Sequence, residues 1–401
     1  MNVAVIGGGA AGFFASISVK QHHPNARVVL FEKSTKVLSK VKVSGGGRCN
    51  VTHSCFDNNV LANNYPRGGR FLKKAFHQFG VNETIDWFGE RNVVLKTEKD
   101  NRVFPITDSS QTIVDCLIQE FEKLGCILNT KSASTAIERN KDQFQLTIND
   151  QKMLFEKVIV ATGGSPKKEG FEWLRKLGHK IELPVPSLFT FNMPKNSVSE
   201  LMGTVAPEAR VRLQGGKLES AGPVLITHWG MSGPAVLKLS AFGARELAER
   251  NYHFSILISW LAAHSEEEVR ELIKSHSTSN RLAQISNFRN EQIPKRLWMY
   301  LITKVGIPLD KRWVDVSKKE LNKIVNVLCN DSYDVRGKTT FKEEFVTCGG
   351  ISLNEVNHQT MESKVVAGLY FSGEVLDIDG VTGGFNFQAA WTTGFIAGKL
   401  N

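Results

Sequence analysis

The chain opens with a strand, a glycine-rich turn and a helix, and this order constrains the fold more than any other feature. Asn2–Ile6 is short, apolar and partly β-branched, as expected of a buried parallel strand, and Ala10–Gln21 has the spacing of a helix. Between them, Gly7 permits a tight turn, Gly9 leaves the backbone open to a pyrophosphate, and Gly12 lets the helix approach the strand. The amides at the helix start are expected to face phosphate oxygens.

A second strand and its terminal carboxylate complete this pattern. Arg27–Phe31 is apolar, and Glu32 follows it, 20 residues beyond Gly12. A carboxylate at this position accepts hydrogen bonds from ribose hydroxyls and disfavours a 2′-phosphate. A glycine turn that binds nothing would explain the glycines, but it would leave Glu32 as a solvated strand end. The pattern therefore predicts a dinucleotide-binding site.

The length and composition are those of a multidomain globular protein. The 401 residues exceed what one hydrophobic core usually organises, so two or three domains are expected. Hydrophobic residues make up 41% and charged residues 22%, which excludes a disordered chain, and no apolar run reaches membrane-spanning length. The six cysteines are scattered without a CxxC pair, which favours reduced thiols and a cytoplasmic location.

The charge distribution is uneven. The formal net charge is +10, and the segment from Lys33 to Lys74 holds nine basic residues and one acid, Asp57. Because this segment follows the predicted dinucleotide site, an anionic cofactor or substrate is the first interpretation. A solvated basic face and a nucleic-acid surface are the alternatives. The chain shows no basic patch interleaved with aromatic residues and no recognised RNA module, so nucleic acid is not the expected partner.

Two more glycine clusters indicate close approach of the backbone to a ligand. Ser44–Asn50 contains three consecutive glycines and Arg48, and Lys157–Val160 is an apolar strand that ends in Ala161–Gly164. Ligands bind at the carboxyl ends of strands in an open α/β sheet. Both clusters are therefore expected to border the same site.

The middle of the chain has the character of an insertion. Pro184 and Pro186 suggest a crossing between domains, and about 190–345 departs from the dinucleotide pattern. Arg210–Glu219, with Gly215 and Gly216 at its centre, predicts a hairpin. Downstream, capping boxes at Ser265–Glu268 and Ser317–Glu320 predict two helices, whose apolar stripes are interpreted as core.

The C-terminal part returns to the pattern of the first residues. Gly368–Glu374 predicts a strand that ends in a glycine and an acid, and Gly383–Ala390 predicts the start of a last helix. This arrangement suits a flavin, because a carboxylate after the strand can bind ribitol hydroxyls. The free amides of a helix start stabilise negative charge at the flavin pyrimidine carbonyl.

These motifs together resemble the BaiN-like, aminoacetone-oxidase-like bacterial flavoproteins. The strings at Ser44–Asn50 and Gly383–Gln388 are distinctive, and Thr227–Ala235 and Arg102–Pro105 match as well. The resemblance spans nearly the whole chain.

The resemblance implies an α/β, glutathione-reductase-like Rossmann FAD domain, formed by residues 1–188 and 346–401. Inserted into it are a β-barrel-like domain, 189–255 with 330–345, and a small helical domain, 256–329.

The resemblance and the motifs also indicate a set of cofactor-binding residues. Lys40 fits the basic position that the family has before the glycine loop, whereas Lys42 stands where an apolar residue is usual. The expected set is Gly7, Gly9, Ala10, Ala11, Gly12, Glu32, Lys33, Lys40, Ser44, Gly45, Gly46, Gly47, Arg48, Cys49, Asn50, Ala161, Thr162, Gly163, Gly373, Glu374, Asp379, Gly384, Phe385 and Asn386.

The predicted function is that of an FAD-dependent oxidoreductase, which passes a hydride or electron pair between a small organic substrate and NADH, NADPH or oxygen, and an anionic substrate is one interpretation of the basic segment. Arg48 and His228 are the catalytic candidates, as an electrostatic stabiliser and an acid or base respectively. No metal site is expected. Because the chain has no second GxGxxG motif of comparable quality, a nicotinamide is expected only as a transient donor. An RNA-modifying flavoprotein and a non-catalytic flavin sensor remain alternatives, and the sequence gives no oligomeric state.

Overall fold

The computed structural model describes residues 1–340 and 346–400, which form two compact units. The first unit contains Met1–Ser187 and the chain after Thr340, and the second contains Leu188–Thr340. The sequence assigned 341–345 to the insert, and these residues lie outside the described part of the chain. The separation of the second unit into a barrel-like and a helical domain stays a prediction.

The first unit is built on a parallel five-stranded sheet. Its strand order is β20 (Leu369–Phe371), β10 (Lys157–Val160), β1 (Asn2–Ile6), β2 (Arg27–Phe31) and β6 (Ile127–Asn129). In the centre, Val5 lies in register with Ile159 on one side and Leu30 on the other. Strands β1, β2 and β10 are almost entirely buried, which is why their sequences are nearly continuous apolar runs. The predicted Rossmann fold is confirmed.

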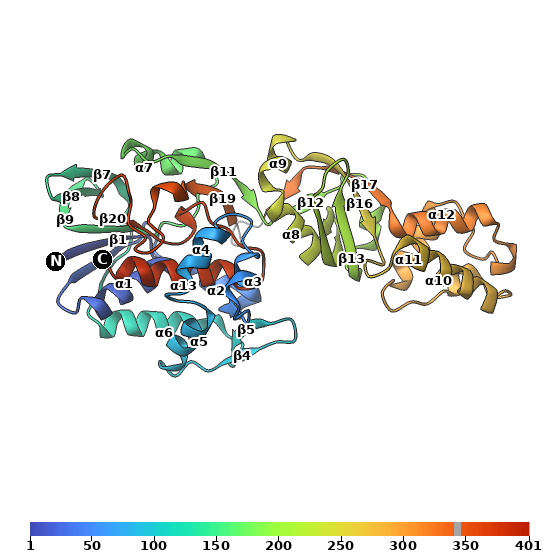
Figure 1. Cartoon of the computed structure of the whole chain (residues 1–401), viewed down its shortest axis with the longest axis horizontal. Helices are drawn as coiled ribbons and strands as arrows, with labels where there is room; N and C mark the ends of the chain where they lie inside the picture. The colour runs from blue at the N-terminus through green and yellow to red at the C-terminus, as the bar shows by residue number, and fades with distance from the viewer. Residues whose placement is uncertain (341–345, 401) are drawn as a thin grey trace. The chain divides into compact units, whose positions relative to one another are not determined.

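Helices from the two ends of the chain pack against each other in this unit. Figure 1 shows the last helix, α13 (Phe385–Gly398), beside the first, α1 (Ala10–His22). Two glycines of α13 make this contact close: a Cβ on Gly394 would lie 2.9 Å from the Ala11 carbonyl oxygen, and one on Gly398 would lie 2.4 Å from the Ser18 Cβ. The remaining helices are α2 (Ser39–Gly47), α3 (Asn58–Ala62), α4 (Gly69–Ala75), α5 (Val81–Gly89), α6 (Ser110–Lys123) and α7 (Glu172–Lys176).

Three small antiparallel sheets complete the first unit. They are β3 (Thr52–His53), β5 (Arg102–Pro105) and β4 (Leu95–Thr97); β7 (Ser134–Asn140), β8 (Gln143–Ile148) and β9 (Gln151–Phe155); and β11 (Ile181–Ser187) with β19 (Val346–Ile351). The prolines at 184 and 186 lie within β11, where the register shifts between Glu182 and Val185. Such a shift accommodates residues that cannot donate a backbone hydrogen bond. The unit boundary follows directly after this strand.

The second unit contains a seven-stranded antiparallel sheet. Its order is β17 (Asp331–Arg336), β16 (His253–Ser259), β13 (Val205–Leu213), β14 (Glu219–Thr227), β15 (Gly230–Ser232), β12 (Thr190–Asn192) and β18 (Lys338–Thr339). The hairpin predicted around Gly215 and Gly216 is confirmed as β13 and β14. The first and last strands of the unit pair with each other, with Thr190 opposite Thr339.

Helices of the second unit share one hydrophobic core with its sheet. They are α8 (Pro234–Phe242), α9 (Ala244–Glu249), α10 (Glu266–Ser279), α11 (Lys295–Lys304) and α12 (Lys318–Cys329). Both predicted capping boxes are confirmed at the starts of α10 and α12. Buried Asp331 joins helix and sheet, because its carboxylate accepts hydrogen bonds from Trp260 (3.0 Å), Tyr333 (2.5 Å) and Lys304 (2.5 Å).

Candidate functional site

The glycine turn after β1 creates an open position beside backbone. Gly7 has φ +115°, and a Cβ there would lie 2.3 Å from the Ala161 carbonyl oxygen. A Cβ on Gly12 would lie 1.9 Å from the Gly7 carbonyl oxygen, so both glycines are required for strand and helix to meet. A Cβ on Gly9 would meet nothing within 4 Å. The surrounding chain therefore leaves room at Gly9, and the approach of a pyrophosphate to this position stays a prediction.

The start of α1 is suited to binding an anion. Gly9 is the N-cap and supplies no side-chain cap, and the first turn contains no acidic residue. The first amides of a helix have no intrahelical partner, and they lie at the positive end of the helix dipole. Ala10 and Ala11 are the first residues of α1, and their binding of a pyrophosphate stays a prediction.

Glu32 lies directly beside this turn. Its carboxylate accepts hydrogen bonds from the backbone amides of Gly8 and Ser34, each at 2.8 Å. These two bonds fix the orientation of the carboxylate, and each oxygen keeps a further lone pair. Glu32 can therefore accept ribose hydroxyls without giving up either bond. Lys33, the next residue, is exposed.

The glycine loop after residue 44 follows a left-handed path. Gly45, Gly46 and Gly47 have φ of +59°, +68° and +84°. The regular helical part of α2 therefore ends before Ser44, where the backbone leaves the helical conformation. A Cβ on Gly46 or Gly47 would meet nothing within 4 Å. Because L residues with side chains rarely adopt this conformation, three in succession require glycine. The loop presents backbone to open space, as expected beside a cofactor.

The side chains of Arg48 and Cys49 interact with other residues of the protein. The Arg48 guanidinium lies 4.0 Å over the Phe104 ring and forms ion pairs with Glu98 (2.6 Å) and Asp108 (3.4 Å). The hydrogen bond to Glu98 is the main cause that raises the pKa of Arg48. Cys49 is buried, and burial raises the pKa of its thiol to about 12. A thiol with this pKa is protonated at neutral pH and is a poor nucleophile.

The carboxyl ends of β10 and β20, on the other side of β1, lie at the same edge of the sheet as the glycine turn. Thr162, after β10, is exposed, and Gly163 has φ +73° with open space where a Cβ would lie. After β20, a Cβ on Gly373 would lie 2.8 Å from the Ala11 Cβ. The carboxyl ends of β2, β1, β10 and β20, which are neighbours in the sheet, thus carry the predicted residues.

Glu374 connects the C-terminal segment to the first part of the chain. Its carboxylate accepts hydrogen bonds from the Thr347 amide (2.7 Å) and from the Lys40 ammonium group (2.8 Å). The sequence placed Lys40 and Glu374 in one site although 334 positions separate them, and the structure brings them into contact. Their roles toward a cofactor stay predictions.

The start of α13 presents further amides. Gly384 is the N-cap with φ +92°, and a Cβ there would lie 2.5 Å from the backbone of Thr52. In the amide orientation that satisfies its neighbours, the Asn50 side-chain oxygen accepts the Gly384 amide at 3.0 Å. The helix has no side-chain cap, so the amides of Phe385 and Asn386 are available. The sequence assigned all three amides to a flavin, and the structure gives the first to Asn50.

Asp379 has a partner that the sequence analysis missed. Its fully buried carboxylate forms a two-point ion pair with Arg67 and accepts a hydrogen bond from Ser187 at 2.6 Å. Burial raises the pKa of Asp379 to about 6, and Arg67 opposes that shift. The two residues are 312 positions apart, so no local spacing could have revealed the pair.

His228 lies in the second unit. It is an exposed residue between β14 and β15, and its ring packs against Trp229 at a centroid distance of 4.2 Å. Its predicted catalytic role stays a prediction.

In the described part of the chain, no helix is long and apolar enough to cross a membrane.

A parallel sheet with this glycine turn, terminal carboxylate and uncapped helix start defines a dinucleotide-binding protein of the Rossmann class. The chain belongs to the HI0933-like family, whose Rossmann-domain model matches residues 1–400. The predicted family resemblance and FAD as cofactor are confirmed. The chain is an FAD-binding protein of an oxidoreductase family.

Relatives with assigned activities match over nearly their full length. A 3-dehydro-bile acid delta(4,6)-reductase of Clostridium scindens is 26% identical, over 99% of this chain and 98% of its own. Ribosomal RNA dihydrouridine synthases are 30% identical in Escherichia coli, over 97% and 95%, and 29% identical in Haemophilus influenzae, over 98% and 96%. A solved 3-ketosteroid-delta4-(5alpha)-dehydrogenase of Rhodococcus jostii shares the fold, with a TM-score of 0.52, 12% identity, and coverage of 99% and 96%.

Proposed function

We propose that this protein is a flavin-dependent reductase of carbon–carbon double bonds conjugated to a carbonyl, with a small organic molecule as substrate and NADH or NADPH as donor. The observation that carries the proposal is the open glycine turn around Gly9 and Glu32, in a chain of an FAD-binding family that matches a bile-acid reductase along nearly its whole length.

The names of the relatives support this bond type. Reduction of a 3-dehydro-bile acid at delta(4,6) and conversion of uridine to dihydrouridine both saturate a double bond that is conjugated to a carbonyl. In each reaction the double bond gains a hydride and a proton, and a reduced donor loses two electrons. One reaction class therefore covers relatives whose substrates differ greatly in size.

Bound FAD supplies the transfer of two electrons. In the proposed site, the Glu32 carboxylate would accept hydrogen bonds from the adenosine ribose hydroxyls, and the amides at the start of α1 would bind the pyrophosphate. The amides of Phe385 and Asn386 stabilise negative charge on the flavin pyrimidine ring, since they lie at the positive end of α13. Arg48 positions the loop through Phe104 and Glu98.

An anaerobic titration tests the proposal. The purified yellow protein is titrated with NADH and with NADPH, and the reduced protein is then mixed with a 3-keto-4-ene steroid or with its saturated analogue. We expect bleaching by one nicotinamide and recolouring by the unsaturated compound alone. Failure of both nicotinamides to bleach the flavin would favour a sensor, and fast recolouring in air alone would indicate an oxidase.

His228 is the proposed proton donor, and its replacement can be separated from cofactor loss. We expect His228→Gln to lower turnover about 100-fold with FAD content unchanged, as for loss of a general acid. His253→Gln removes another exposed histidine of the same unit and serves as the matched control. If the two variants turn over equally, His228 has no catalytic role.

Reduction of uridine in ribosomal RNA is the second candidate. It is favoured by identities of 30% and 29% to the dihydrouridine synthases and by the net charge of +10. Unmodified ribosomal RNA transcribed in vitro is incubated with protein and nicotinamide, and dihydrouridine is measured by mass spectrometry of the nucleosides. Dihydrouridine formed here, with no turnover of conjugated ketones, would replace the small-molecule proposal.

A further inference from the structure

His53 is a titratable residue that lies against the turn into α13 and has no role in the proposed function. It is the last residue of β3, and the backbone of its neighbour Thr52 would lie 2.5 Å from a Cβ on Gly384. The imidazole of His53 stacks on the Phe385 ring, with a centroid distance of 4.7 Å and an interplanar angle of 21°. Its Cδ2 atom lies 3.5 Å from the position that a Cβ on Gly383 would take. The ring is therefore adjacent to the first residues of α13.

The same face of the small sheet also meets the glycine loop. His53 lies opposite Arg102 where β3 pairs with β5, and directly paired side chains share a face of a sheet. Phe104 stands two residues beyond Arg102 and so belongs to this face as well. A Cβ on Gly45 would lie 3.0 Å from the Phe104 ring. The face that carries His53 therefore adjoins both the glycine loop and the start of α13.

The charged groups around His53 differ from it in how they titrate. Arg102 donates a hydrogen bond to the Asp100 carboxylate at 2.7 Å and lies 3.3 Å from Glu98, so its fixed charge is compensated. The first turn of α13 contains no acidic residue. Burial lowers the pKa of His53, and the charge of Asp100 opposes this shift. The half-buried imidazole is therefore neutral at neutral pH, but its charge can change there when its surroundings change.

We propose that His53 compensates the negative charge of the reduced flavin by taking up a proton when the flavin is reduced. This inference rests on the proposed function, which assigns the flavin pyrimidine ring to the amides of Phe385 and Asn386. Reduction brings two electrons and one proton to the flavin, which is then an anion, and a second proton passes from the solvent to the imidazole. A negative charge that appears nearby in a partly buried site favours the protonated form of a histidine. The helix amides supply a constant positive potential, whereas His53 supplies a charge that follows the redox state.

The pH dependence of the flavin midpoint potential tests this inference. The FAD-containing protein is reduced with dithionite in the presence of a reference dye, from about pH 6 to about pH 9, where a histidine near an anion titrates. Neither a nicotinamide nor an organic substrate takes part. The result is therefore separate from the nicotinamide titration, whose failure would count against the proposed reductase but not against the role of His53.

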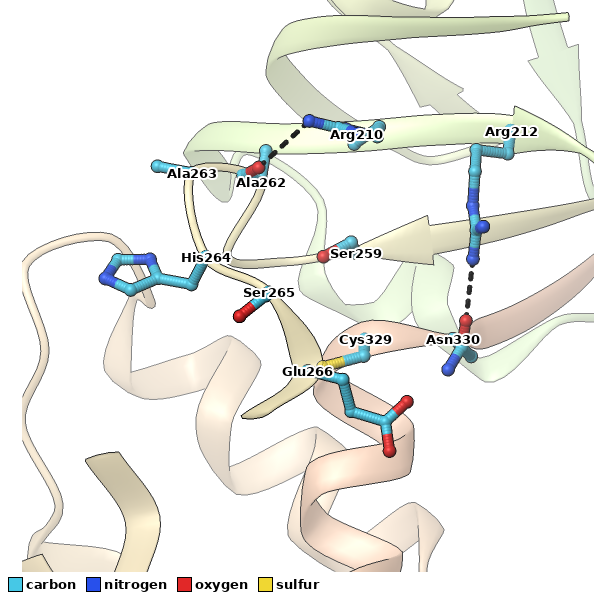
Figure 2. Close-up of a pocket in the computed structure, with 10 residues that line it drawn as sticks. All are labelled: Arg210, Arg212, Ser259, Ala262, Ala263, His264, Ser265, Glu266, Cys329 and Asn330. Atoms are coloured by element: carbon cyan, nitrogen blue, oxygen red, sulfur yellow. Dashed lines mark hydrogen bonds between the residues drawn. The ribbon is translucent and has the colours of Figure 1, made fainter. Parts of the chain in front are cut away.

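Three variants are compared with the natural protein. His53→Gln removes the titratable ring, and His53→Arg keeps a positive charge at every pH used. The control is His264→Gln, because His264 is also half-buried and also has a buried Nδ1 atom without a hydrogen-bond partner. Figure 2 shows His264 in the second unit, on the loop that leads into α10. Flavin absorbance and the unfolding temperature show whether each variant is folded and holds FAD.

We expect two protons to accompany two electrons in the natural protein, over the interval between the pKa values of His53 in the oxidised and reduced states. The equilibrium constant for reduction then falls about 100-fold per pH unit, which is about 59 mV for a two-electron couple. In His53→Gln and His53→Arg one proton remains, and the constant should fall about tenfold, or about 30 mV, per pH unit. The potential of His53→Arg should lie above that of His53→Gln, and His264→Gln should match the natural protein.

Two results would overturn the proposal. One is a tenfold dependence at every pH in the natural protein, and the other is the same dependence in the natural protein and in His53→Gln. If His53→Gln does not retain FAD, the comparison of the natural protein with His53→Arg decides in the same way, because the arginine cannot exchange a proton at these pH values.

Discussion

Glycines of the turn after β1 differ in what an added methyl group would meet. At Gly12 it would collide with the Gly7 carbonyl oxygen at 1.9 Å, whereas at Gly9 it would enter open space. The two positions thus separate a requirement of folding from a requirement of ligand binding. Sequence spacing alone assigned both glycines to one motif.

We expect Gly9→Ala to change the unfolding free energy of the FAD-free protein by less than about 1 kcal/mol and to weaken FAD binding about tenfold or more. Gly12→Ala should lower the unfolding free energy by about 3 kcal/mol, because helix and strand must separate. Urea unfolding and quenching of flavin fluorescence measure the two quantities. Unchanged FAD affinity in Gly9→Ala would place the cofactor elsewhere.

Asp379 gives a pH dependence of defined sign. Its pKa is raised to about 6 in the folded protein by burial, above the value of an exposed carboxyl, so the folded state holds this proton more tightly than the unfolded state. Its contribution to stability is therefore fully present below about pH 4 and is lost as the pH rises through about 6. Relative to Asp379→Asn, the natural protein should lose stability across this window.

Urea unfolding at several pH values from about 2 to 7 measures this difference and also covers the range in which an exposed carboxyl titrates. Asp57 provides a control of opposite sign, because hydrogen bonds from the amides of Val60 and Asn59 lower its pKa. The natural protein should gain stability relative to Asp57→Asn as the pH rises through the carboxyl range. A difference for Asp379→Asn that does not fall between pH 4 and 6 would contradict the assignment.

At the scale of elements, local sequence signals predicted individual helices and strands, but they did not predict which distant strands pair. The strand, turn and helix of Asn2–His22 and both capping boxes appear where the sequence indicated, since each depends on residues within one turn or strand. The pairing of β11 with β19 and the three-stranded sheet from Ser134 to Phe155 were not predicted. Their residues have no distinctive turn motif or spacing, and their partners are fixed by tertiary contacts.

The capping box of α12 is a measurable element. The Ser317 hydroxyl accepts the Glu320 amide at 3.3 Å, and the Glu320 carboxylate accepts the Ser317 amide at 2.8 Å. We expect Ser317→Ala to lower the unfolding free energy by about 1 kcal/mol, because a helix amide loses its partner. Ser275→Ala, at an exposed position inside α10, is the control and should change it by a few tenths at most. Equal effects in urea unfolding would show that the box contributes nothing.

At the scale of the molecule, sequence motifs predicted where a cofactor could bind but not which distant residues surround that place. The glycine strings and Glu32 report on the cofactor directly, because few other constraints demand them. Arg67 and Ser187 give no such signal, since their buried contacts with Asp379 are visible only once distant segments meet. The chain length predicted two or three domains, and the structure divides into two compact units.

The second unit is expected to fold by itself. Its hydrophobic core draws on residues between Phe189 and Val335, and Thr190 pairs with Thr339, so its two ends are adjacent. We expect residues 188–340 to form a colourless fragment with one cooperative unfolding transition, and the remainder, joined by a short glycine–serine linker, to retain FAD. Circular dichroism and the visible spectrum check the two products. A fragment without cooperative unfolding would show that the core is incomplete.

The placement of α13 against α1 determines when the cofactor can be bound during synthesis. In the proposed site, β1 and α1 act together with the amides of Phe385 and the carboxylate of Glu374, which are synthesised much later. Contacts between such distant positions close slowly. We therefore expect the inserted unit, which precedes α13 in the chain, to be synthesised before the flavin site can be completed.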